Sequence, residues 1–551
     1  MPSSRLITHI MTALLEFLTA KDKIVRFRAT QLVAQIINSV NTIDDDVYYM
    51  TRIGFLKRLR DKEPSIRVQA ALGLIRLAGD NDNDDGENEE DSDEEDTLSG
   101  LHDKLIDIMV NDSSAEVRRA VLQNLSVQIN GLRKMLERAR DTDPTVRRIV
   151  YNKILPQIDF RQLSLVEREK LLRWGLRDRD EGVRKAAVSL FCNHWIESCA
   201  APRDNRAPEE KKPGETVPPN LDALCEMLER IEITSSGVKG GIAHEAMKVF
   251  WEFRPDYLKF VTFDHDFWKD LDPFQAFVAR SLRDYSSSLD DATMRDMLED
   301  KMPEISNFTW VLQRHLNLLI ELVDKLAAAE DDSPEANEAQ EDTDDQNFVV
   351  QQLLQMSLTF DYSDEVGRNQ IFNIMRGAIA RAQLPDECTK LAIDVLRECC
   401  GNRGESDFCQ IAWEAIIDIE DIVKAPAKDE DVDDSFHSAH SDISDDSVST
   451  VQSNKGSDTQ EEVDPVAEVE KQEREIAVYS KCLLIARCTL QNVRCDPESE
   501  SSLENMLQNL IEPSLFGRRS KTLREGGAIC LGLCALLSKV HSRFPHHDTH
   551  H

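Results

Sequence analysis

The chain has 551 residues, of which 41% are hydrophobic and 6% aromatic, and its formal net charge is −36. This length is too great for one compact core, so the chain forms either several domains or an extended stack of repeats. No apolar run approaches the roughly 20 residues that cross a bilayer, and the N-terminus lacks the pattern of a secretion signal, which together predict a soluble intracellular protein.

Acidic residues are concentrated in three segments. Segment 80–96 holds 12 acids and no base, 330–345 holds nine acids and no base, and 429–470 holds 14 acids and one base. They carry −34 of the net charge of −36, whereas 1–79 and 101–196 each carry +5. Acidic, aromatic-poor runs cannot bury enough apolar surface to offset chain entropy. We therefore predict that these segments are disordered and that the folded N-terminal third is basic.

One short motif recurs through the N-terminal third. It consists of an acid, a few polar residues, Val or Ile, Arg, and a small or apolar residue three positions later. Its arginines are 41, 51, 29 and 37 residues apart, and the longest interval contains segment 80–96. Periods near 40 are typical of HEAT and armadillo repeats, which are stacked pairs of helices. The motif occurs at Asp22–Ala29, Asp61–Ala70, Asp112–Val121, Asp141–Val150 and Asp178–Ala187.

Two helices can be traced in one repeat. Ser164 and Glu167 have the spacing of a capping box, which begins a first helix through Val166, Leu171, Leu172 and Leu176. Residues 178–182 break this helix. The apolar positions that follow have helical spacing and predict a second helix whose buried face includes a core histidine. These positions are Val183, Ala186, Ala187, Leu190, Phe191, His194 and Trp195.

The sequence shows almost no sustained alternation of apolar and polar residues between hairpin turns. We therefore predict an all-α fold, a HEAT-repeat superhelical solenoid with disordered acidic insertions. The expected organisation is HEAT repeats at 1–79, 98–328, 347–426 and 473–545, an acidic insertion at 80–97, an acidic linker at 329–346, an acidic Ser-rich linker at 427–472 and a tail at 546–551.

The recurrent Arg has two interpretations. In the last four motifs an Asp of the turn lies six residues before the Arg, and such residues can form ion pairs that join adjacent repeats. The alternative is a direct contact to phosphate. We favour the structural role for the residues Asp61, Arg67, Asp112, Arg118, Asp141, Arg147, Asp178 and Arg184.

Cations outside these pairs are the better candidates for binding a polyanion. Between 133 and 153 alone there are seven bases and three acids. A merely solvated position is the alternative for any single residue, but together they predict a DNA-binding surface. The candidates are Lys21, Lys23, Arg28, Lys57, Arg58, Lys62, Arg119, Arg133, Lys134, Arg148, Lys153 and Lys185.

Sequence signatures of catalysis are missing. The glycine-rich stretch 237–241 lacks both the spacing and the Ser or Thr of a phosphate-binding loop, and no hydrolase, metalloprotease or kinase signature is present. The 12 cysteines form no C-x-x-C pair, which favours buried reduced thiols over disulfides or a zinc site. We expect no enzymatic activity, no cofactor and no structural metal, so binding is the function to explain.

Several longer stretches resemble one family, the HEAT-repeat G subunits of condensin (condensin subunit 3). VRFRATQLVAQIINSV (25–40) and RLRDKEPSIRVQAALGLIRL (58–77) resemble its N-terminal repeats, with an acidic insertion after the second stretch in both. Its next repeats are similar to DTDPTVRRIVYNKIL (141–155) and GLRDRDEGVRKAA (175–187). CLLIARCTLQNV (482–493) and LREGGAICLGLCALL (523–537) resemble the start of its C-terminal region.

This resemblance implies a non-catalytic regulatory subunit that binds the kleisin subunit of condensin and grips double-stranded DNA with it. The ATPase subunits would be reached through the kleisin. The resemblance also implies location in the nucleus and on chromosomes, with a cytoplasmic phase in the cell cycle. Further family repeats are expected before the first residue and after the last.

Two other binding functions remain open. One is a HEAT adaptor of the importin or scaffold type that binds basic protein cargo, and the other is a histone-binding protein that uses 429–470. The distribution of charge distinguishes the first from DNA binding, because a cargo receptor presents acids on its folded surface. Here the acids are confined to the insertions, and the folded N-terminal third is basic.

The acidic segments also contain candidate phosphorylation sites. Each phosphate would add about −1.5 to −2 charges and strengthen competition with DNA. An unmodified linker is the alternative. The candidate sites, most of them spaced three residues apart, are Ser92, Ser435, Ser438, Ser441, Ser444 and Ser447.

Overall fold

A computed structural model describes the chain at residues 2–40, 43–79, 98–127, 129–206, 215–237, 239–329, 333–401, 404–424, 465–517 and 520–538. All regular structure within these ranges is helical, and none of the described residues belongs to a strand. The predicted all-α fold is confirmed. The chain divides into two compact units, 1–262 and 263–551, and each is described by itself.

The first unit consists of short helices arranged in pairs. Single 3-10 turns occur at Arg138–Arg140, Leu155–Gln157, Phe160–Gln162 and Ala201–Arg203. The α-helices are α1 (Pro2–Phe17), α2 (Lys23–Ser39), α3 (Asp45–Arg58), α4 (Pro64–Gly79), α5 (Leu98–Asn111), α6 (Ala115–Asn124), α7 (Ile129–Glu137), α8 (Pro144–Ile149), α9 (Leu165–Leu176), α10 (Glu181–Ser189), α11 (Ile196–Ala200), α12 (Leu221–Glu229), α13 (Ile233–Ser236), α14 (Ile242–Phe253) and α15 (Pro255–Phe260).

The second unit contains longer helices. A 3-10 turn lies at Pro497–Ser499, and π-helical turns lie at Leu507–Ile511 and Pro513–Gly517. The α-helices are α16 (His265–Lys269), α17 (Pro273–Ser287), α18 (Ala292–Glu299), α19 (Ile305–Ala328), α20 (Pro334–Ser357), α21 (Glu365–Ile379), α22 (Asp386–Cys400), α23 (Glu405–Lys424), α24 (Pro465–Asn492), α25 (Ser501–Met506) and α26 (Lys521–Leu537).

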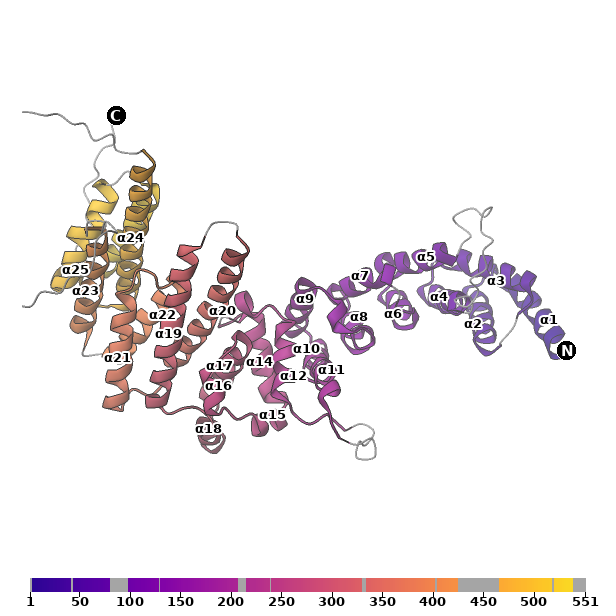
Figure 1. The fold of residues 1–551 in the computed structure, drawn as a ribbon. Coiled ribbons are helices and arrows are strands. Elements are labelled where there is room, and N and C mark those ends of the chain that lie inside the picture. The colour runs from indigo at the N-terminus through magenta and orange to yellow at the C-terminus, as the bar shows by residue number, and fades with distance from the viewer. Residues whose placement is uncertain are drawn as a thin grey trace, which may run out of the picture. The chain divides into compact units, whose positions relative to one another are not determined.

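Successive helix pairs of the first unit stack in register. The second helices of the repeats contact one another in the order α2, α4, α6, α8, α10, and first helices contact each other at α1–α3 and α5–α7. Figure 1 shows α3, α5 and α7 in one row and α4, α6 and α8 in the other. We call these rows the first-helix layer and the second-helix layer. This stacking is that of a HEAT-repeat solenoid, because each pair buries its apolar stripe against its neighbours.

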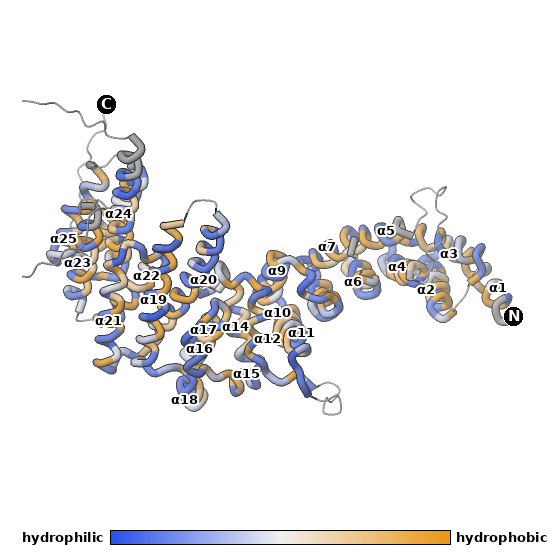
Figure 2. Tube along the Cα trace, viewed as in Figure 1, coloured by the Kyte–Doolittle hydropathy of each residue, from blue (hydrophilic) through white to orange (hydrophobic). Residues whose placement is uncertain are grey.

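The two layers meet on apolar side chains. On α4, Ile66, Ala70 and Leu74 recur at helical spacing and are fully buried. Figure 2 shows such hydrophobic positions returning along the helices of both units. Phe55 of α3 is also fully buried, and a Cβ at Gly73 would lie 2.3 Å from its ring. The absence of a side chain at Gly73 therefore allows α3 and α4 to approach closely.

The capping box that begins α9 is present as predicted. Ser164 Oγ accepts from the Glu167 amide, and the Glu167 carboxylate accepts from the Ser164 amide. Val166, in the first turn of this helix, is 56% exposed. Leu171 and Leu172, later in the helix, are buried.

The prediction that His194 lies in the core is wrong. The helix that begins as α10 becomes a π-helix over Leu190–Trp195, and His194 is exposed. A π-helical turn adds a residue to the turn and rotates the positions that follow. Consequently Trp195 and Ile196 are buried in place of His194. A second π-helical turn, Val150–Ile154, continues α8 in the same way.

The prediction of a disordered linker at 329–346 is also wrong from Pro334 onward, because α20 begins there. The Ser333 hydroxyl accepts from the Ala336 amide at 3.0 Å and caps the helix. Residues 335–345 contain six acids and no base. Negative charge near a helix N-terminus is favourable. The same helix continues through Phe348, Val349 and Val350, whose burial anchors it.

The Ser-rich linker ends earlier than expected. Helix α23 ends at Lys424, and α24 begins at Pro465, inside the expected linker 427–472. Segments 80–97 and 425–464 and the tail 546–551 lie outside the described residues. The remaining assigned boundaries stay predictions.

All 12 cysteines are free thiols in the structure, nine of them buried and three half-buried. Burial raises the pKa of Cys192 to about 12 and that of Cys400 to about 11, which keeps both thiols protonated. Among the described helices, none is both long enough and apolar enough to cross a membrane.

Candidate nucleic-acid interface

Four arginines of the second-helix layer each hold an aspartate of the following repeat. Arg118 Nε donates to Asp141 Oδ2 at 2.9 Å, and its Nη2 donates to Asp141 Oδ1 at 2.6 Å. Arg147 holds Asp178 in the same two-pronged way at 2.7 and 2.8 Å. We call the four pairs the arginine ladder. They are Arg26–Asp61, Arg67–Asp112, Arg118–Asp141 and Arg147–Asp178.

An Asp lies six residues before Arg67, Arg118 and Arg147, and it plays a different part. Its backbone carbonyl, and not its carboxylate, accepts from Nη1 of that Arg, at 2.9 Å for Arg67 and Asp61 and at 2.9 Å for Arg147 and Asp141. The guanidinium therefore binds its own turn through a carbonyl and the next turn through a carboxylate. Sequence spacing identified the Arg and the Asp of each motif. It did not show which Asp offers its carbonyl and which its carboxylate, because that depends on how successive turns are stacked.

The ladder is buried and electrostatically matched. The side chains of Arg118 and Asp141 are 9% and 2% exposed. Burial alone would raise the pKa of Asp141, but hydrogen bonds from Arg118 and from the Asp143 amide hold it below its ordinary value. The hydrogen bond to Asp141 likewise raises the pKa of Arg118. Both groups are thus charged and desolvated together, and the guanidinium edges engaged here are not open to a phosphate.

Six of the 12 candidate DNA-binding cations have partners within the chain. Arg58 binds Asp61 at 2.7 Å and is 18% exposed, which removes it from the free surface. Lys23 pairs with Glu63, Arg28 donates to Gln31, Arg119 lies 3.7 Å from Asp143, Lys153 donates to the Gln123 carbonyl, and Lys185 pairs with Glu181. All except Arg58 are weak surface contacts that a ligand could displace.

The other six are exposed and hold no ion pair or side-chain hydrogen bond among the described residues. They are Lys21, Lys57, Lys62, Arg133, Lys134 and Arg148.

Five of the candidate cations adjoin the ladder in the sequence. Lys21 and Lys62 follow the carbonyl that holds a ladder Arg, and Arg119, Arg148 and Lys185 each follow the recurrent Arg in its helix. Because the ladder joins successive turns, we infer that these positions follow one another from repeat to repeat. With Lys57 in the last turn of α3, they make up what we call the basic edge.

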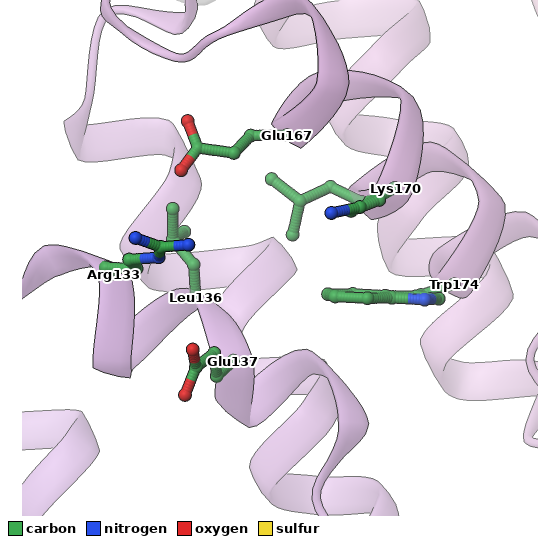
Figure 3. A pocket seen from close by; sticks show the side chains of 7 residues that line it. Arg133, Leu136, Glu137, Glu167, Lys170 and Trp174 are labelled. Atoms are coloured by element: carbon green, nitrogen blue, oxygen red, sulfur yellow. The ribbon is translucent and has the colours of Figure 1, made fainter.

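Arg133 and Lys134 lie elsewhere, on α7 of the first-helix layer. Arg133 lines a hollow of about 100 Å³ between α7 and α9, together with Leu136, Glu137, Glu167, Lys170, Leu171 and Trp174. Figure 3 shows Arg133 near Glu167 on one side of the hollow and the Trp174 ring on the other. The structure therefore does not bring all 12 cations onto one surface.

Two further expectations concern phosphorylation and metal binding. The candidate phosphorylation sites Ser92, Ser435, Ser438, Ser441, Ser444 and Ser447 lie outside the described residues. Among the residues that are described, no group of three or more His, Cys, Asp or Glu side chains is placed to hold a metal ion.

Comparisons with known proteins converge on one family. A family model described as "Nuclear condensing complex subunits, C-term domain" matches residues 481–543. The chain is 30% identical over 558 residues to condensin complex subunit 3 of Schizosaccharomyces pombe, with 98% of this chain and 55% of that protein covered. It is 30% identical over 422 residues to the Saccharomyces cerevisiae protein of that name, covering 76% of this chain and 37% of that protein.

A solved structure is similar over the same range. The crystal structure of the S. pombe condensin Cnd3–Cnd2 subcomplex matches with a TM-score of 0.71 and 28% identity, covering 98% of this chain and 56% of that one. This chain therefore spans about half the length of the relative in that structure.

Proposed function

Because the chain belongs to the condensin subunit 3 family, we propose that it is a non-catalytic regulatory subunit of condensin. In this proposal it binds the kleisin subunit and, with it, double-stranded DNA during mitotic chromosome condensation. The ATPase subunits are reached through the kleisin, and the place of action is the chromosome in the nucleus.

The observation that carries the proposal is the match to a relative seen with a partner. Cnd3 in the similar structure is in complex with Cnd2, a kleisin. Nearly the whole of this chain aligns with 56% of Cnd3 at a TM-score of 0.71, so the surfaces of that part of Cnd3 have counterparts here. This supports a kleisin as the protein partner.

The basic edge supports DNA as the second ligand. Helices of adjacent repeats pack roughly 8–10 Å apart, so the four steps between five repeats span about 32–40 Å. This is about one turn of B-form DNA, roughly 34–36 Å. Lysine and arginine along such an edge contact phosphates without reading bases, which favours binding that is salt-dependent and tolerant of sequence. Residues 1–79 and 101–196 each carry a net charge of only +5, which is small for tight DNA binding by the chain alone. We therefore expect a bound kleisin to improve the retention of DNA.

The test is a titration of duplex DNA with the chain alone and with the chain bound to a kleisin fragment. In the variant Lys21→Glu/Lys62→Glu/Arg148→Glu we expect weaker binding on every duplex sequence. The slope of log affinity against log salt should become shallower by about 0.9 for each phosphate that the variant no longer neutralises. The bound kleisin fragment should slow DNA dissociation.

A matched variant controls for net charge. Lys325→Glu/Lys390→Glu/Lys471→Glu makes the same change at exposed cations of the second unit and should bind DNA like the wild type. Equal binding by the first variant and the wild type, with both folded by circular dichroism, would refute the basic edge. Failure of the chain to co-purify with any kleisin fragment would refute the family role.

A further inference from the structure

The arginine ladder has an unfinished last rung. Arg184 occupies the ladder position in α10, and its Nη1 donates to the carbonyls of Asp178 at 2.8 Å and Arg179 at 3.1 Å. Arg147 is held in the same way by the carbonyls of Asp141 and Thr142, at 2.9 and 3.3 Å. The guanidinium of Arg184 is thus oriented as in the preceding repeats.

The carboxylate that completes the other rungs is missing at Arg184. In each ladder pair, Nε and Nη2 of the Arg hold an Asp from the turn of the next repeat. The turn before α14 is 237–241, with the sequence Gly-Val-Lys-Gly-Gly and no acid. Within the described part of the chain, no carboxylate forms an ion pair with Arg184.

Arg184 instead lines an open hollow. The hollow has a volume of about 330 Å³ and is formed by Arg184 with Leu176 and Val188 on one side and Val249, Glu252 and Phe253 of α14 on the other. Phe253 is 47% exposed, so part of its ring is open to a ligand. A volume near 300 Å³ is at the lower end of that found for specific ligand sites.

We propose that this hollow docks a short acidic segment of a partner protein. The carboxylate of one Asp or Glu would complete the rung by accepting from Nε and Nη2 of Arg184, and an adjacent apolar side chain would cover Phe253 and Val249. The site is preorganised by the fold, because backbone carbonyls already hold the guanidinium and the same group binds a carboxylate in each of the four ladder pairs.

The chemistry of the hollow favours a peptide over DNA. Phosphate could also accept from the guanidinium, but four of the six lining side chains are apolar and Glu252 would repel a polyanion. A peptide with a single acid beside an apolar residue matches both the cation and the apolar wall. The acids of this chain's own insertions are a possible competitor, and the test includes their removal.

The experiment selects the ligand rather than assuming it. Random short peptides displayed on phage are selected on the wild-type chain and depleted on the variant Arg184→Gln. We expect the survivors to share an Asp or Glu next to an apolar residue. Their affinities are then measured by fluorescence anisotropy, each beside a counterpart whose acid is replaced by its amide.

Arg184→Gln removes a charge-assisted, bidentate interaction. It should lower the affinity for the acidic peptides by at least about tenfold and leave the affinity for the amide peptides nearly unchanged. Glu252→Gln removes a negative charge from the hollow and should increase the affinity for the acidic peptides. Arg179→Gln removes a neighbouring exposed cation and controls for charge, and thermal unfolding verifies that each variant is folded. Arg184→Lys keeps the positive charge but cannot donate two parallel hydrogen bonds to one carboxylate. Its affinity for the acidic peptides should therefore lie between those of the wild type and Arg184→Gln.

Three results would overturn the proposal. One is a selected set without a common acid, and another is equal binding of acidic peptides by Arg184→Gln and the wild type. The third is displacement of the peptides by duplex DNA in both the wild type and Arg179→Gln, which would assign the site to phosphate. Tighter peptide binding after deletion of 429–470 would support the site and identify an internal competitor.

Discussion

The choice of Arg over Lys at each ladder position has a geometric reason. A guanidinium is a planar fork that can donate two parallel bonds to one carboxylate and still use Nη1 for a backbone carbonyl. In Arg118 all three functions are occupied, by Asp141 and by the carbonyl of Asp112. An ammonium group could keep one of these interactions in that geometry. The ladder therefore fixes how one turn sits on the next, which apolar packing alone does not specify.

Removing one buried ladder charge should destabilise the first unit strongly. Asp141→Asn leaves Arg118 desolvated without its counterion, and breaking a buried pair in this way typically costs about 3–5 kcal/mol. The exposed Asp103→Asn should cost much less. Chemical denaturation of both variants measures the difference, and equal losses would show that the pair does not stabilise the stack.

The same residue predicts how stability depends on pH. The pKa of Asp141 is lower in the folded state than in the unfolded chain, where it is about 3.9. The carboxylate therefore contributes stability above that pH, and the contribution is lost as pH falls toward the folded pKa. Asp61 and Asp178 share this direction. Wild-type stability should fall more steeply below about pH 4 than that of Asp141→Asn.

At the scale of single helices, local patterns identified the starts of helices better than their later register. The Ser164–Glu167 capping box depends only on residues three apart, and the structure contains it. His194 was misplaced because a π-helical turn changes the phase between Leu190 and Trp195. Such a turn forms where tertiary packing favours it, and nothing in the local spacing of apolar residues signals it.

Helix α20 shows that an acidic composition alone does not predict disorder. Its acids would be disordered in isolation, but they extend a helix whose C-terminal half is anchored by Phe348 and Val350. The signal for it was present in Ser333 followed by Pro334, an N-cap residue followed by proline at the first helical position.

The cap of α20 makes a local prediction. Ser333→Ala removes the acceptor for the Ala336 amide and should destabilise the first turns by about 1 kcal/mol. The acidic half of the helix packs least, so the effect should appear as faster hydrogen exchange at 336–345, about fivefold, with little change in global unfolding. Ser333→Asp supplies another capping oxygen and should restore protection. Unchanged exchange in Ser333→Ala would mean that the acidic half is held by other interactions.

At the scale of the whole chain, the sequence predicted the repeat class and the basic N-terminal third but could not arrange its cations. Lys62 and Arg148 share the basic edge, whereas Arg133 belongs to the other layer, although Arg133 and Arg148 are only 15 residues apart. Layer membership follows from which helix of a repeat carries the residue. Sequence spacing also could not predict that Arg184 lacks an Asp partner. This absence is recognised only by comparing Arg184 with the preceding Arg–Asp pairs in the structure.

The acidic insertions should act on DNA binding through charge. Segment 80–96 carries 12 acids and lies in sequence between α4 and α5, whose repeats both contribute to or adjoin the basic edge. A polyanion so placed competes with DNA phosphates for the same lysines and arginines. Screening limits this competition to about a Debye length, roughly 8 Å at physiological salt. Phosphorylation of Ser92 would strengthen it by about −1.5 to −2 charges.

Deleting 80–96 should therefore tighten DNA binding at low salt and have little effect at high salt, while deleting 429–470, farther along the chain, should matter less. Replacing 80–96 by an uncharged Gly/Ser segment of equal length separates charge from chain connectivity and should reproduce the deletion. Duplex affinities of all three variants are measured across a salt series, with a phosphomimetic Ser92→Asp expected to move slightly the other way. If the Gly/Ser replacement binds DNA at low salt as the wild type does, the insertion is a passive connection, because its charge is the one property that the replacement removes.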